Sequence, residues 1–169
     1  MIVVDGKTSR GSKDRKQGKS PLHLVSSWAC ANRMVLGYEA TTGKLNEITA
    51  IPKLLELLKL KGCIVTIDAM GCQTAIARQI IEQKGEYVLG PKENQPLLYE
   101  AVDDYFTIAR NDGFKNIKYG YAEEIDKGHG RMEIRRHWIC ENLSTLPHPE
   151  RWEGLRNIGM VEREWERPA

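Results

Sequence analysis

The sequence predicts an α/β fold in which helices flank a mixed β-sheet, with further β structure near the C-terminus. Two short runs rich in Val and Ile, typical of buried strands, end at Asp5 and Asp68. Three predicted strands come first, and helices then alternate with strands, an order that produces a mixed sheet with crossover helices. The 169 residues suit one domain with a workable core.

The first strand is expected over residues 1–5 and is followed by a polar loop, rich in Lys and Gly, over residues 6–20. Two more strands are expected over residues 22–31 and 34–40, joined by a tight turn. These three segments therefore predict an antiparallel meander at the start of the chain.

Apolar residues at helical spacing mark the first helix, over residues 47–60, with Asn46 as its N-cap. Similar patterns of periodicity and turn residues predict a strand over 63–67, a helix over 73–83, a strand over 86–90, a helix over 95–110 capped by Asn94, strands near 115–121 and 131–140, a helical turn around 149–155 and a strand near 158–164. The inward residues are expected to be Ala75, Ile76, Ala77 and Ile80 in the second helix, and Leu97, Leu98, Ala101, Val102, Tyr105 and Phe106 in the third.

This order of elements is the layout of the ribonuclease H-like fold, in which the first and fourth strands are central neighbours. Asp5 and Asp68 end those two strands, so we expect their carboxylates to lie side by side. Paired carboxylates can share hard divalent cations such as Mg²⁺, and paired metals serve phosphoryl transfer. The alternative is that both are ordinary residues at strand ends, since Asp is common in turns.

Charge alone does not indicate a nucleic-acid partner, because 25 basic and 23 acidic residues leave a net charge of only +2. The distribution is more informative. Residues 7–19 contain one acid, Asp14, and six cations, namely Lys7, Arg10, Lys13, Arg15, Lys16 and Lys19. Such a cluster is either a solvated loop or a surface that holds a phosphate backbone.

The four cysteines predict free thiols in a reducing cytoplasm. They are Cys30, Cys63, Cys72 and Cys140, and their spacing matches no zinc site. No apolar run reaches the length of a membrane span, and no signal peptide is visible. A cytoplasmic protein without a membrane partner is therefore expected. The two ends of the sequence also suggest an internal piece of a longer protein.

Five stretches of the sequence, taken together, carry a resemblance to a known family. They are residues 5–11 (DGKTSRG), 68–73 (DAMGCQ), 92–95 (KENQ), 129–135 (HGRMEIR) and 155–159 (LRNIG). In this order they resemble the H-repeat-associated insertion-sequence transposases of bacteria, a branch of the DDE transposases. Glu93 is a departure, because the family usually has Gly there.

The resemblance implies a ribonuclease H-like catalytic core over about residues 1–112 and an incomplete β-rich insertion over about residues 113–169. It implies two Mg²⁺ ions, DNA as partner, and metal-dependent cleavage and strand transfer of insertion-sequence ends. The complete enzyme could be a homodimer. Asp5 and Asp68 would be the first two acids of the catalytic triad and its metal ligands. The candidate DNA-binding residues are Lys7, Arg10, Lys92 and Arg131.

The third acid of the family is expected in a downstream helix, within a His-Trp-x-Ile-Glu-Asn motif. Residues 137–142 (HWICEN) are only superficially similar, because Cys140 precedes the Glu and the stretch follows directly on the matched residues 129–135. Glu133 and Glu141 remain candidates, although Glu133 alternates with Arg131 and Arg135 and is more simply explained by an ion pair on a strand face. We therefore expect an acid beyond Ala169 and an inactive fragment. The alternatives are a non-catalytic DNA-binding remnant and a ribonuclease H-like nuclease.

Overall fold

The computed structural model describes residues 1–9, 22–41, 47–128 and 131–166. The chain forms two compact units. The first contains Met1–Pro96 and Glu150–Gly154, and the second contains Leu97–Pro149 and Leu155–Ala169. Each unit has its own cluster of buried apolar residues.

The first unit is built on a mixed five-stranded sheet with the order β3-β2-β1-β4-β5. Its strands are β1 (Ile2–Ser9), β2 (Leu22–Ala29), β3 (Met34–Thr41), β4 (Ile64–Ile67) and β5 (Glu86–Leu89). β1, β2 and β3 pair antiparallel, whereas β4 pairs parallel with both β1 and β5. The predicted meander and the predicted adjacency of the first and fourth strands are confirmed.

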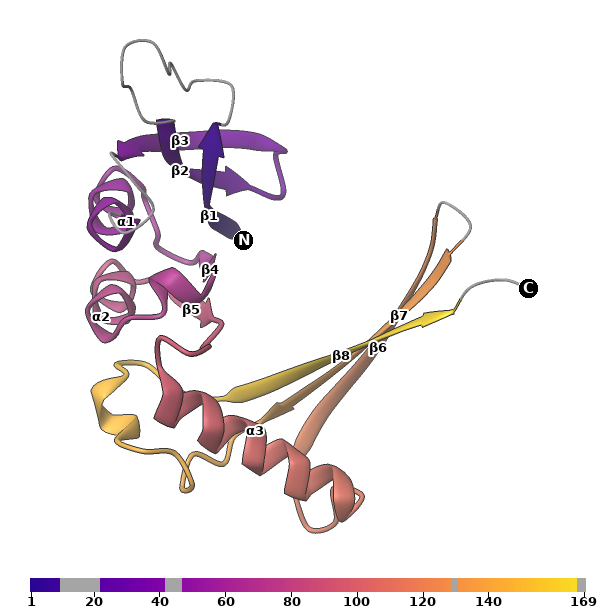
Figure 1. Cartoon of the computed structure of the whole chain (residues 1–169). Coiled ribbons are helices and arrows are strands. Elements are labelled where there is room, and N and C mark those ends of the chain that lie inside the picture. The colour runs from indigo at the N-terminus through magenta and orange to yellow at the C-terminus, as the bar shows by residue number, and fades with distance from the viewer. Residues whose placement is uncertain (10–21, 42–46, 129–130, 167–169) are drawn as a thin grey trace. The chain divides into compact units, whose positions relative to one another are not determined.

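Two helices cover one face of this sheet, α1 (Glu47–Glu56) and α2 (Thr74–Glu82) (Figure 1). Alternate strand residues point toward them, because successive side chains in a strand face opposite sides. The resulting core contains Val4, Val25, Val65 and Ile67 from the strands and Ile51, Leu54, Leu55, Ile76 and Ile80 from the helices. The opposite face of the sheet therefore carries the intervening residues.

The second unit packs α3 (Pro96–Asn111) on a three-stranded antiparallel sheet with the order β6-β7-β8 (Figure 1). The strands are β6 (Tyr119–Gly128), β7 (Arg131–Cys140) and β8 (Ile158–Glu166). Its core contains Tyr105 and Phe106 from the helix, with Cys140 and Ile158 from the strands.

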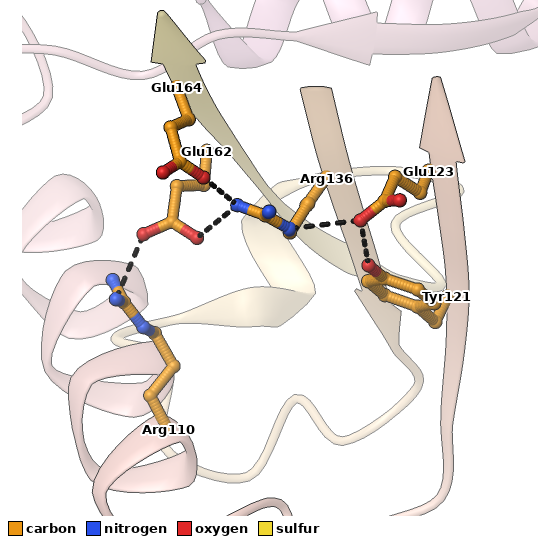
Figure 2. A network of polar contacts seen from close by, with 6 residues as sticks. All are labelled: Arg110, Tyr121, Glu123, Arg136, Glu162 and Glu164. Carbon is orange, nitrogen blue, oxygen red and sulfur yellow. Dashed lines mark hydrogen bonds and ion pairs between the residues drawn. The ribbon is translucent and has the colours of Figure 1, made fainter. Parts of the chain in front are cut away.

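An ion-pair network crosses the same three strands (Figure 2). Arg136 on β7 lies 2.9 Å from Glu123 on β6 and 2.7 Å from Glu164 on β8. Glu162 on β8 lies 4.0 Å from Arg136 and 2.9 Å from Arg110 on α3. The hydrogen bond to Glu164 is the main cause that raises the pKa of the Arg136 guanidinium. The network therefore ties the strands of the second unit to its helix.

Some boundaries and faces differ from the sequence prediction. β1 does not stop at Asp5 but runs to Ser9, because antiparallel pairing with β2 continues to the pair Ser9↔Leu22. The first helix ends at Glu56, where Leu57 and Leu58 donate backbone hydrogen bonds three residues back instead of four. Asn46 lies outside the described residues.

Two helix-face predictions also need correction. Ala75 and Leu97 are exposed, whereas Ile76, Ala77, Ile80, Tyr105 and Phe106 are buried as predicted. Trp28 is 41% exposed, because alternation places Ser27 in the core instead. Within the described residues, no helix is both long and apolar enough to cross a membrane.

Candidate active site

Asp5 and Asp68 occupy equivalent positions on adjacent parallel strands. The pairing of β1 with β4 ends at Val4↔Ile67, and Asp5 and Asp68 are the next residues on each chain. Both strand directions continue, since Asp5 still pairs with Ser26 and Asp68 has an extended backbone (φ −69°, ψ −176°). Neighbouring strands are about 4.8 Å apart, so the two backbones are close at this point.

The two aspartates also share a face of the sheet. Val4 and Ile67 point into the core, so the residues that follow them emerge on the opposite side. Both aspartates are exposed. We call this side the aspartate face. It carries Val3, Asp5 and Lys7 from β1, Leu24, Ser26 and Trp28 from β2, Ile64 and Thr66 from β4, Asp68, and Glu86 and Val88 from β5.

The Asp68 carboxylate is oriented by the turn that follows it. Asp68 is the N-cap of η3 (Ala69–Gly71), and its Oδ1 accepts a hydrogen bond of 3.2 Å from the Met70 backbone N–H. Among the described residues, no other side-chain bond is formed by either aspartate, and no cation pairs with them. One Asp68 oxygen is thus held by the backbone, and the other forms no hydrogen bond to a described residue.

Close packing of Gly71 against core side chains fixes the turn after Asp68. A Cβ built on Gly71 would lie 2.2 Å from Ile67 Cγ2 and 3.0 Å from Ile51 Cδ1, so only glycine fits. The next residue, Cys72, is buried, and burial raises the pKa of its thiol to about 11. The chain therefore returns to the core within four residues of the Asp68 carboxylate.

The candidate DNA-binding residues are distributed unevenly. Lys7 is exposed and lies two residues from Asp5 on the aspartate face. Lys92 is exposed in the segment between β5 and α3. Arg10 lies outside the described residues, and Arg131 begins β7 of the second unit, with its side chain also outside the described part.

The two candidates for a third acid inside the chain are both engaged in ion pairs of the second unit. Glu133 lies 2.5 Å from Arg135 and 3.8 Å from Arg163, and its side chain is 12% exposed. The predicted ion pair with Arg135 is therefore confirmed. Glu141 lies 3.3 Å from Lys118 on an exposed surface. Among the described residues, no group of three or more His, Cys, Asp or Glu side chains could hold a metal ion.

The donor set of Asp5 and Asp68 nevertheless fits a hard divalent cation. Mg²⁺ is commonly bound through one or two carboxylates, with water and substrate phosphates as its other ligands. Two exposed carboxylates on adjacent strands, neither paired with a described cation, match that requirement. The arrangement could hold a metal against a phosphate group.

Two residues that contact the Asp68 turn were not among the predicted site residues. Asn94 was expected to cap the third helix, but α3 begins at Pro96, and the Asn94 side chain donates to the Ala69 carbonyl instead. The Gln95 side chain donates to the Cys72 carbonyl. The only signal in the sequence was the position of both residues in the matched stretch 92–95.

Comparison with known proteins agrees with the resemblance. Residues 1–145 match the model of the family described as "Transposase DDE domain". The chain is 40% identical over 162 residues to an "Uncharacterized protein in dhlA 3'region" of Xanthobacter autotrophicus, covering 96% of this chain and 53% of the relative. It is 38% identical over 159 residues to the "H repeat-associated putative transposase YhhI" of Escherichia coli K12, covering 94% and 41%.

A third relative is the "Putative transposase YncI" of Escherichia coli O157:H7, 42% identical over 159 residues, which cover 94% of this chain and 40% of that protein. The chain thus spans about half, or less, of the length of these relatives. The family model covers most of the 169 residues, including both aspartates. The chain belongs to the family of transposase DDE domains.

Proposed function

We propose that this chain contains the metal-binding centre of a DDE transposase that cuts insertion-sequence ends and joins them to target DNA. The observation that carries the proposal is the β1/β4 register, which brings Asp5 and Asp68 together on one face of the sheet. The mixed sheet with crossover helices is compatible with a ribonuclease H-like core. We propose that this core spans about residues 1–112 and a β-rich insertion about residues 113–169, although α3 packs with the strands of the second unit.

Asp5 and Asp68 would hold Mg²⁺ through their carboxylate oxygens. When bound, a pair of Mg²⁺ ions supplies Lewis-acid chemistry, activating the attacking water or 3′-hydroxyl and stabilising the departing oxygen. The protein's own part is positioning. Asp68 presents its carboxylate in an orientation set by the Met70 N–H, and Asp5 is held within the paired β1/β2 ladder. Preorganised ligands of this kind place the scissile phosphate with little cost in reorganisation.

Cations near the aspartates would bind the DNA backbone. Lys7 shares their face, and Lys92 lies beyond β5, the neighbour of β4. We assign both to phosphate contacts, together with Arg10 and Arg131. Such contacts position DNA without reading its sequence, so binding by this chain should be weak, non-specific and lost with added salt.

We further propose that this chain alone catalyses no strand transfer. In-line phosphoryl transfer needs both metals placed accurately, and a third carboxylate normally completes that placement. Within the described residues the two internal candidates, Glu133 and Glu141, are already paired with cations. Cleavage therefore requires a third carboxylate ligand for the metal ions, in addition to Asp5 and Asp68.

Manganese binding tests the proposed site directly. Mn²⁺ can be titrated into the 169-residue chain and followed by the relaxation of water protons. Asp5→Asn and Asp68→Asn each remove a charged ligand and should weaken binding about tenfold or more, since a lost charge-assisted contact costs about 1.5–3 kcal/mol. Asp103→Asn is the matched control, because Asp103 is an exposed residue of α3.

Supercoiled plasmid with Mg²⁺ or Mn²⁺ gives the second readout. We expect no nicking above background from the wild-type chain. Equal Mn²⁺ affinity in the wild type, Asp5→Asn and Asp68→Asn would reject the metal centre. Nicking that disappears in Asp5→Asn would instead show that the site is complete within this chain.

A further inference from the structure

We propose that Asn94 and Gln95 are positioning residues that clamp the turn carrying Asp68. The inference rests on the proposed function, because it assigns these side chains a role in holding the metal ligand Asp68. Both lie in the segment between β5 and α3, and both reach back to the turn after β4. Neither is itself proposed to touch metal or DNA.

The turn itself depends on a few backbone bonds. The Gly71 N–H donates to the Asp68 carbonyl at 3.1 Å, and the Cys72 N–H donates to the Ala69 carbonyl at 3.1 Å. The Met70 N–H fixes the Asp68 carboxylate at 3.2 Å. Because that carboxylate is exposed, its direction is determined by where the turn holds the Met70 N–H. A small displacement of the turn would therefore rotate the proposed metal ligand.

Two side-chain amides hold the turn near its two ends. Asn94 Nδ2 donates to the Ala69 carbonyl at 2.5 Å, and Gln95 Nε2 donates to the Cys72 carbonyl at 3.0 Å. A carbonyl oxygen has two lone pairs, so Ala69 can accept from Asn94 and Cys72 at once. The Asp68 carboxylate lies just before the first clamped carbonyl. The clamp therefore restrains the segment that sets its orientation.

The clamp is anchored to the same sheet as the aspartates. β5 pairs with β4 up to Ile67↔Leu89, and the Gly90 N–H approaches the Ile67 carbonyl at 3.4 Å. The Gln95 N–H donates to the Lys92 carbonyl at 2.8 Å, which closes the segment into a turn. The pairing of β5 with β4 thus fixes where the two amides lie relative to Asp68, the residue that follows β4.

The chemistry of the clamp explains the residue types. The two carbonyl oxygens accept hydrogen bonds from side-chain donors, which Asn and Gln amides supply and Asp and Glu carboxylates do not. An Asp at position 94 would keep the shape, lose the donor and add a negative charge. Added charge alone attracts a cation, whereas a displaced Asp68 weakens its binding. In Asn94→Asp, Mn²⁺ affinity therefore rises if the added charge dominates and falls if the displacement of Asp68 dominates.

The experiment titrates Mn²⁺ into the wild-type chain, Asn94→Ala, Asn94→Asp, Asn94→Gln and the double variant Asn94→Ala/Gln95→Ala. Glu93→Ala is the matched control, being an exposed neighbour in the same segment. Loss of one clamp bond should weaken Mn²⁺ binding about threefold to tenfold, which corresponds to the net free energy of a typical hydrogen bond. Asn94→Asp should weaken it too, despite its charge, and Asn94→Gln, which keeps the donor, should restore part of it.

Amide hydrogen exchange without metal gives an independent readout. Exchange of the Gly71 and Cys72 amides should accelerate in the double variant while the midpoint of urea unfolding stays near that of the wild type. Mn²⁺ binding that is insensitive to Asp5→Asn would reject the proposed function itself. Mn²⁺ binding that depends on Asp5 but is equal in wild type and double variant, or is strengthened by Asn94→Asp, would overturn the clamp alone.

Discussion

Replacing Gly71 with alanine should destabilise the first unit, because there is no room for a methyl group beneath the Asp68 turn. The added Cβ would lie 2.2 Å from Ile67 Cγ2. Ordinary contact between carbon atoms is about 3.5 Å, so one of the two groups must move by about 1.3 Å. Ile67 cannot yield cheaply, since Cγ2 branches from its Cβ and its backbone is paired on both sides.

Overpacking of this kind typically costs about 1–3 kcal/mol. The free energy of unfolding can be measured by urea denaturation followed by far-UV circular dichroism. Gly90→Ala is the matched control, because a Cβ there meets no atom within 4 Å and Gly90 follows the neighbouring strand. The control should change the free energy of unfolding by no more than about 0.5 kcal/mol.

A double-mutant cycle identifies the clash as the cause. Ile67→Ala removes Cγ2, so Gly71→Ala should cost less in that background than in the wild type. The reasoning would be refuted if Gly71→Ala cost no more than Gly90→Ala. It would also be refuted if the cost of Gly71→Ala were unchanged by Ile67→Ala.

Three further predictions concern pH, the ion-pair network and DNA. Burial raises the pKa of Cys72 from 9.0 to about 11, so its contribution to stability is complete below pH 9 and is lost as the pH rises toward 11. Urea unfolding between pH 8 and 11 should show a shallower decline for Cys72→Ala, and equal slopes would contradict this. Arg136→Met should lower the free energy of unfolding, because three carboxylates lose their shared cation. Lys118→Met, at the exposed pair with Glu141, should leave the free energy of unfolding nearly unchanged. Equal effects of the two substitutions would argue against a stabilising network. Lys7→Ala should weaken binding of duplex DNA and reduce the slope of log affinity against log salt by about one, and an unchanged slope would exclude a phosphate contact.

The order of the elements could be predicted because it depends on local patterns. Buried strands such as β4 are short apolar runs, and helices such as α2 repeat their apolar residues at helical spacing. Once the order of helices and strands is predicted, Asp68 is placed directly after the fourth strand. The predicted adjacency of strands one and four required an analogy between folds, and the observed sheet order agrees with it.

The extent of β1 could not be predicted in the same way. Residues 6–9 (GKTS) are polar and contain a glycine, a composition typical of a loop. They form a strand because residues of β2 pair with them, from Gly6↔Val25 to Ser9↔Leu22. Tertiary pairing of this kind overrides local propensity. On β2 the small polar Ser27 occupies the core and donates to the Gly37 carbonyl at 3.4 Å, which leaves its neighbour Trp28 exposed.

The contacts around Asp68 lie beyond any local pattern. Asn94 and Gln95 are separated from their acceptors by 25 and 23 residues, and the meeting depends on the register between β4 and β5. A shift of one residue in that register would turn every side chain of β5 to the other face. The sequence can therefore indicate that a segment matters, while the partner of each side chain emerges only with the sheet.

For the third acid, too, the sequence pattern indicates the face of a side chain, whereas the structure is needed to identify its partners. Alternation along β7 indicates that Glu133 shares a face with Arg135, and the structure adds Arg163 from β8 as a second cation. A carboxylate that is only 12% exposed and lies beside two guanidinium groups is stabilised as part of that sheet. Recruiting it to a metal would leave Arg135 without this partner, at a cost in the stability of the second unit. Asp5 and Asp68 face no such competition among the described residues, which is why we propose a metal centre there and not on the charged strands of the second unit.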